Sequence, residues 1–173
     1  MPIHRLLKAG VLFLLVAGSL GIGAPMIVAA SKEADAKKAT EDLKKTKDTK
    51  VKIAAIEKLG ELGQIQSSYA EAAIPEMMKA LEDKDAGVRA AAAKALGQAV
   101  SEDPGTVPAL VKLLKGDKEE SVKIAAAEGL GLLGAKAKDS VNDLRAAAKD
   151  AEKKGKLAKA IGTSLKSING TKK

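Results

Sequence analysis

The chain has 173 residues, no cysteine, no tryptophan and a formal charge of +8 at pH 7, with an isoelectric point near 9.5. The absence of cysteine excludes disulfides and thiolate metal sites, and a single histidine, His4, makes acid–base catalysis unexpected. Hydrophobic residues form 46% of the chain but aromatic residues only 1%, which favours closely packed helices.

Residues 1–30 have the pattern of a secretory signal peptide. Arg5 and Lys8 supply the positive start, and an uncharged apolar run follows over residues 9–20. Pro25 is expected to break the helix that this run forms. The segment is therefore expected to be removed from the mature protein.

The expected cleavage site follows Ala30, because Val28 and Ala30 occupy the −3 and −1 positions. Residues 34–36 offer a second, poorer site. An uncleaved membrane anchor is the alternative: residues 9–30 are long enough to cross a bilayer, although four glycines and a proline weaken that span. In both cases we expect an exported protein whose body is periplasmic or extracellular.

A ten-residue phrase occurs three times and defines a repeat. It reads VKIAAIEKLG from Val51, VRAAAAKALG from Val88 and VKIAAAEGLG from Val122. Intervals of 37 and 34 residues are typical of repeat solenoids. Apolar residues at i, i+4, i+8 and i+11 predict a buried face on the first helix of each repeat. The members of this face are Val51, Ala55, Leu59 and Leu62, then Val88, Ala92, Leu96 and Ala99, then Val122, Ala126, Leu130 and Leu133.

Glycines fall in register near the ends of these first helices. Gly60, Gly97 and Gly131 are expected to permit close helix contact, since no strand precedes them to form a phosphate-binding loop. Gly63 and Gly134 are expected to be C-caps.

A second helix is expected in each repeat, starting near residues 74, 107 and 141, where proline occupies the first turn of two of them. Its inward positions are Ile74, Met77 and Leu81, then Val107, Leu110 and Leu114, then Val141, Leu144 and Ala148.

These elements divide the chain into segments. After the signal peptide or anchor of residues 1–30 comes a Lys-rich linker or short helix at 31–47. The repeat domain covers 48–170, with units of about 48–84, 85–118 and 119–150 and a C-terminal capping helix at 152–168. The capping helix has one apolar stripe, made by Leu157, Ile161, Leu165 and Ile168, and a charged remainder.

The middle unit carries the most specific pattern, D-x-x-V-R-x-A-A-x-x-x-L-G, from Asp85 to Gly97. The other units match it with Lys for Arg, and the third has Glu119 for the aspartate. This pattern resembles HEAT repeats, in particular the short HEAT-like repeats of the phycobilisome-lyase type, over about residues 48–148. The resemblance implies an all-α fold: an α-solenoid of about three helix–turn–helix repeats plus the capping helix. It also implies a right-handed stack whose second helices line a concave face that binds another macromolecule.

A ladder of charges lies in repeat register. The bases Lys52, Arg89 and Lys123 each follow an acid by four residues, at Asp48, Asp85 and Glu119. We interpret the ladder as structural, because acid–base pairs at i and i+4 stabilise a helix and an acid suits its N-terminus. In HEAT-like repeats, such ladders also tie neighbouring repeats together.

A second basic ladder gives the candidate partner-binding face. Lys79 and Lys112 occupy equivalent positions on the second helices, and Lys115, Arg145 and Lys149 lie to one side. The alternative is an ordinary solvated surface, since exposed charges are common.

The functional hypothesis is an exported, non-catalytic scaffold or adaptor that binds another protein, whose identity the sequence does not reveal. The first alternative is charge-driven binding to an anionic polymer or membrane surface. The second is an accessory subunit of an enzyme such as a bilin lyase. No catalytic residue, cofactor, metal or small-molecule substrate is expected.

Specific nucleic-acid binding is not expected. Of the 30 basic residues, 27 are lysines, which lack the planar fork that reads phosphates and guanines. Tyr69 is the single aromatic residue after position 30, so a base-stacking platform is missing.

Overall fold

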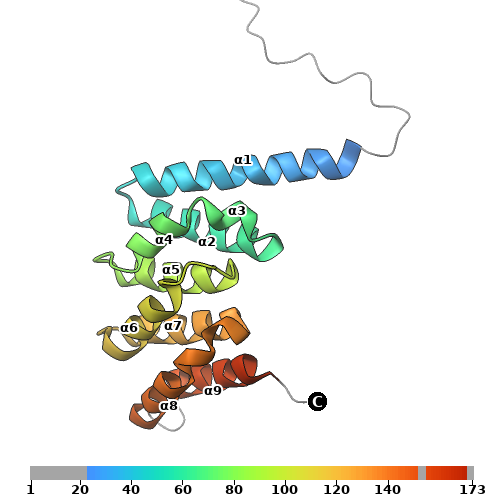
Figure 1. The fold of residues 1–173 in the computed structure, drawn as a ribbon. Coiled ribbons are helices and arrows are strands. Elements are labelled where there is room, and N and C mark those ends of the chain that lie inside the picture. The colour runs from blue at the N-terminus through green and yellow to red at the C-terminus, as the bar shows by residue number, and fades with distance from the viewer. Residues whose placement is uncertain (1–22, 152–154, 171–173) are drawn as a thin grey trace, which may run out of the picture.

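The computed structural model describes residues 23–151 and 155–170, and every regular element in these ranges is helical (Figure 1). The elements are α1 (Gly23–Lys45), α2 (Thr49–Ile65), α3 (Ser68–Glu71), α4 (Ile74–Ala80), α5 (Ala86–Gln98), α6 (Thr106–Gly116), α7 (Glu120–Leu133), the 3₁₀ helix η1 (Gly134–Ser140), α8 (Val141–Asp150) and α9 (Lys156–Asn169).

The helices form two layers along one stack. The first helices of the repeats, α2, α5 and α7, pack against one another in order, and α9 packs on α7 as the next member of this layer. Each second helix packs on the first helix of the following unit: α4 on α5, α6 on α7 and α8 on α9. Figure 1 shows the stack running from α1 at one end to α8 and α9 at the other. The predicted all-α solenoid with a C-terminal capping helix is confirmed.

The first helices form where the sequence predicts them, because each combines a start signal with an apolar stripe. The carboxylate of Asp48 accepts hydrogen bonds from the backbone of Lys50 and Val51 at 2.8 and 3.2 Å. Asp85 does the same for Val88 at 3.1 Å. Such N-caps satisfy backbone donors that the first helical turn leaves free.

The predicted core faces of the three first helices are buried with one exception, and on the second helices the predicted inward residues Val107, Val141 and Ala148 are only half-buried. Leu59, Leu96 and Leu130 are fully buried at equivalent positions. Val51 is 42% exposed, although Val88 and Val122 at the same repeat position are fully buried. The difference follows from the neighbours: α5 and α7 pack on a second helix of the preceding repeat, whereas α2 follows α1 directly.

The in-register glycines permit the close packing of the first helices, as predicted. A Cβ on Gly97 would lie 2.6 Å from the Cα of Gly129 in α7, and a Cβ on Gly131 would lie 2.9 Å from the Cα of Ser164 in α9. Gly134 ends α7 with a φ of +56°, as expected of a C-cap. Gly63 does not cap α2, which continues to Ile65; a Cβ there would lie 2.8 Å from Ala99.

The segment expected as a linker or short helix, residues 31–47, is mostly part of the 23-residue helix α1. Ala36, Ala39, Thr40 and Leu43 are buried along one stripe. Their spacing of three and four residues places them on one helical face, which packs on α2. The segment is therefore an N-terminal capping helix and not a linker.

Most of the expected signal segment lies outside the described residues. Its last residues, 23–30, are helical and continuous with α1, and Pro25 lies in the first turn, where a missing N–H is tolerated. In the described part of the chain, no helix is both long and apolar enough to cross a membrane.

The C-terminal capping helix begins at Lys156, four residues after the predicted start at residue 152, and Gly155 precedes it. Residues 152–154 lie outside the described ranges. Of the predicted apolar stripe, Ile161 and Ile168 are buried and Leu157 and Leu165 are half-buried, and Gly170 closes the helix with a φ of +69°.

Candidate partner-binding surface

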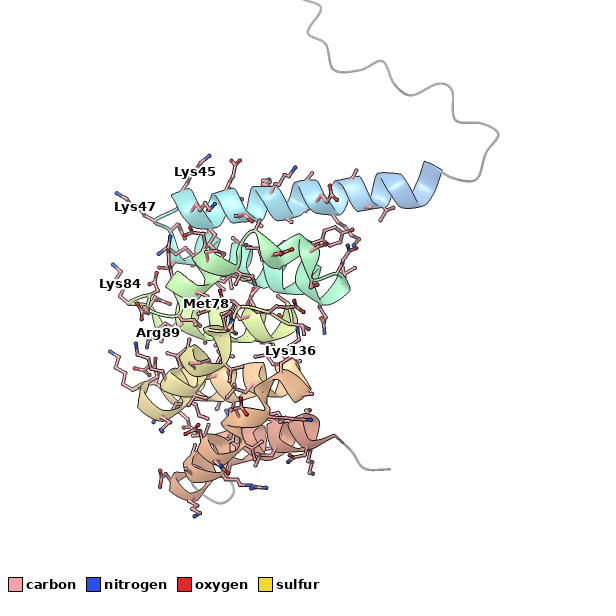
Figure 2. The ribbon with its side chains drawn as sticks, in the orientation of Figure 1. Lys45, Lys47, Met78, Lys84, Arg89 and Lys136 are labelled. Atoms are coloured by element: carbon pink, nitrogen blue, oxygen red, sulfur yellow. The ribbon has the colours of Figure 1, made fainter. Side chains whose placement is uncertain are left out.

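Two ion pairs occupy the edge where the turns between repeats lie. Lys52 in α2 donates to Asp83 at 2.6 Å. Arg89 in α5 donates through Nε and Nη2 to both carboxylate oxygens of Asp117, at 2.7 and 2.9 Å. Nη1 of Arg89 also donates to the backbone carbonyls of Asp83 and Lys84. Figure 2 shows Arg89 and Lys84 on this edge and Lys136 on the opposite side of the stack.

These pairs correct the predicted pairing and confirm its structural role. Asp48 and Asp85 cap their helices and do not pair with the bases four residues later. The bases reach 31 and 28 residues forward instead, to the turn that ends their own repeat. The ladder therefore joins the first helices α2 and α5 to the turns that lead into the next repeats. Lys123 holds the equivalent position, but the turn ahead of it is only partly described.

The electrostatics of this edge fit a structural role. A backbone hydrogen bond from Asp85, together with the bond from Lys52, lowers the pKa of Asp83 below its ordinary value. The bidentate bond from Arg89 lowers the pKa of Asp117, and the same bond raises the pKa of Arg89. All three groups keep their charges at neutral pH and hold one another in place.

The predicted site residues lie on the second helices and are exposed. Lys79 is on α4, Lys112 and Lys115 are on α6, and Arg145 and Lys149 are on α8. The structure does not gather them around one centre. They are spread along the exposed side of α4, α6 and α8, which we call the second-helix face.

Acidic residues interrupt this basic face. Lys79 pairs with Glu76 at 3.1 Å within α4. The other two pairs cross between repeats: Lys112 bonds Glu82 at 3.3 Å, and Lys115 bonds Asp143 at 3.1 Å. A surface of paired charges attracts an anionic polymer only weakly, since its charges are already partly neutralised.

An apolar groove lies between these ion pairs. It has a volume of about 490 Å³ and runs between α4 and α6. Its polar rim is the Lys112–Glu82 pair. Its apolar lining is made by Met78, Leu81, Ala109 and Leu113, and we call it the α4–α6 groove. Chemically it suits an apolar side chain of a partner, and the paired charges at its rim suit polar contacts around that anchor.

Sequence reasoning missed the half-buried residues Met78, Ala109 and Leu113 of this groove. The available signal was their position directly next to predicted core residues: Met78 follows Met77, and Ala109 precedes Leu110. An apolar residue next to the core stripe lies at the border of the buried face, where the neighbouring repeat covers its side chain only in part. Among the described residues, no group of three or more acidic side chains converges into a potential metal site.

Comparison with known protein families gives one match, which covers more than half of the chain. The family model described as HEAT repeats matches residues 36–131. The match starts at Ala36, a buried residue of α1, and ends within α7. No curated protein matches the chain.

Proposed function

The chain belongs to the HEAT repeat family, and we propose that it is an exported, non-catalytic scaffold or adaptor that binds another protein through its second-helix face. HEAT repeats generally mediate protein–protein interaction. The observation that carries the proposal is the α4–α6 groove, because it offers apolar surface on the layer that faces away from the first helices. A partner side chain buried there would lose water contact while the rim pairs remain solvated.

Binding can be tested by capturing partners from a cell-envelope extract with the purified protein. Lys112→Glu places a negative charge beside Glu82 at the rim of the groove, and Lys79→Glu does the same beside Glu76 on α4. Both changes should weaken the capture of a specific partner. Lys58→Glu is the matched control, since Lys58 pairs with Glu61 on a first helix.

The proposal is wrong if partners captured by the native protein are retained equally by the two second-helix variants. Loss of capture by Lys58→Glu alone would place the binding surface on the first-helix layer.

Export is the second part of the proposal; it rests on the signal-peptide pattern of residues 1–30, and the packing of α1 is compatible with cleavage after Ala30. Residues 28–35 of α1 are exposed or half-buried, and Ala36 is the first buried residue in the part of α1 whose burial is described, from residue 28 on. Cleavage after Ala30 therefore keeps every residue of α1 that is buried between positions 28 and 45, whereas cleavage after Ala36 removes one of them. Mass spectrometry of the protein from the producing cell should give an N-terminus at Ser31. An intact chain in the membrane fraction would favour the anchor instead.

A further inference from the structure

The positive charge of this protein is concentrated at one end of the sequence. Residues 134–173 contain eleven basic and four acidic residues, a formal charge of +7. Residues 31–133 contain 17 basic and 18 acidic residues, a formal charge of −1. In the described part of this segment, η1, α8 and α9 contain seven basic and three acidic residues, a formal charge of +4, at the C-terminal end of the stack.

A second groove lies at this end, on the first-helix layer. It runs between α7 and α9 and has a volume of about 580 Å³. Its apolar lining includes Ile124 and Leu132 of α7 and Ala160 of α9. Leu132 is 41% exposed, so its side chain adds uncovered apolar surface to this groove. We call this the α7–α9 groove.

The rim of the α7–α9 groove is mainly basic. Lys94 reaches it from α5, and Lys156 and Lys159 reach it from α9. Glu128 is the acid at the rim. Among the described residues, no carboxylate lies within 4 Å of the Nζ of Lys94 or Lys159. This distinguishes the groove from the second-helix face, where the lysines of α4 and α6 are paired.

The base of the groove is fixed by tight packing of α7 on α9. The hydroxyl of Ser164 in α9 donates to the backbone carbonyl of Ala127 in α7 at 2.6 Å. Gly131 lets the helices approach this closely, since a Cβ at that position would overlap Ser164. The groove is therefore preformed, and a ligand need not order it first.

We propose that the α7–α9 groove docks an acidic amphipathic segment of a partner protein. Aliphatic side chains of such a segment would cover Leu132 and Ile124, as an amphipathic helix lies in a hydrophobic groove. Its carboxylates would meet Lys94 and Lys159, so that the charges are complementary. The inference stands apart from the proposed function, which places binding on the opposite layer.

An anionic membrane fits the same charge less well. The apolar side chains line a hollow, whereas a membrane-binding surface projects them outward. Aromatic residues, which favour the membrane interface, are missing from η1, α8 and α9.

The experiment is an unbiased selection from a random-peptide display library on the protein purified in the form that cells produce. The expected result is enrichment of peptides that combine Asp or Glu with Leu, Ile or Val at helical spacing. Binding of the enriched peptides should fall at least tenfold in Leu132→Asp and in Lys159→Glu. The control Val51→Asp, at an apolar residue of α2 that is 42% exposed and lines neither groove, should leave binding unchanged. Circular dichroism melts of each variant show that the fold is retained.

Three results would overturn the proposal. The first is a selection that enriches no acidic, aliphatic peptides. The second is full binding of the enriched peptides by Leu132→Asp. The third is equal displacement of them by polyglutamate or by anionic vesicles, which would mean that charge alone drives binding or that the natural ligand is a lipid surface.

Discussion

Arg89 and Asp117 form a bidentate ion pair that joins a first helix to the turn leading into the next repeat. The two side chains are 10% and 6% exposed. Arg89 also donates to two backbone carbonyls of the preceding turn, so one guanidinium links both turns that flank the middle repeat. A buried charge in this position stabilises the fold only while its partner is present.

Removal of the acid should therefore be costly. We expect Asp117→Ala to lower the free energy of unfolding by about 3 kcal/mol, because it leaves the Arg89 charge buried without its carboxylate. Urea denaturation measures the change. The control Asp143→Ala removes the exposed pair with Lys115, and should change stability by less than about 0.5 kcal/mol. Equal effects of the two substitutions would contradict a dominant role for the buried pair.

The two inter-turn ion pairs, Lys52–Asp83 and Arg89–Asp117, predict how stability depends on pH. The pKa values of Asp83 and Asp117 are lowered in the folded state, with ordinary values of 3.8. A group with a lowered folded pKa contributes stability above its unfolded pKa, and this contribution is lost as pH falls through the folded value. We expect the free energy of unfolding to drop below about pH 4, and Asp117→Asn to flatten that drop. Parallel curves for the native and variant proteins between pH 7 and 2 would contradict this.

A Gly→Ala substitution should have opposite effects on stability at a glycine in a close helix contact and at a glycine facing open space. Gly97→Ala places a methyl group 2.6 Å from the backbone of α7, so we expect a loss of about 1–3 kcal/mol of stability. Gly162→Ala in α9 meets no atom within 4 Å, and should gain about 0.5–1 kcal/mol from helix propensity. Thermal denaturation of both variants measures the difference. A stabilising Gly97→Ala would mean that the helices are not in close contact.

The repeat core could be predicted from the sequence because its signal is local and occurs three times. Leu59, Leu96 and Leu130 share one register and one helical period, and all three are fully buried. The partners of Lys52 and Arg89 could not be predicted in the same way. The local rule pairs residues four apart, whereas the geometry of the turn brings in acids 31 and 28 residues ahead.

The candidate surfaces were predictable in part. The exposed lysines of the second helices were found by register, since a helical face repeats with the unit. The grooves between repeats could not be predicted, because they depend on how much of each helix its neighbour covers. Leu132 illustrates the limit: it follows the buried residue Leu130 by two positions, and the sequence alone does not show that α9 leaves it 41% exposed.

That α1 caps the N-terminal end of the stack was not predicted from the sequence, because its buried stripe has few large apolar residues. Its buried stripe consists of Ala36, Ala39 and Thr40 with one large residue, Leu43, among many lysines and acids. Leu43→Ala should lower the free energy of unfolding by about 2–3 kcal/mol, because it removes the largest apolar contact of α1 with α2.

Lys44→Ala is the matched control for Leu43→Ala. It makes the same substitution one residue later, at an exposed position of α1. Because solenoid repeats contact only their neighbours, the repeats beyond α2 should stay folded in Leu43→Ala. Limited trypsin digestion should then cut first at Lys37 or Lys38, while the rest of the chain stays resistant. If Leu43→Ala is digested and unfolds like Lys44→Ala, α1 is a tether and not a cap.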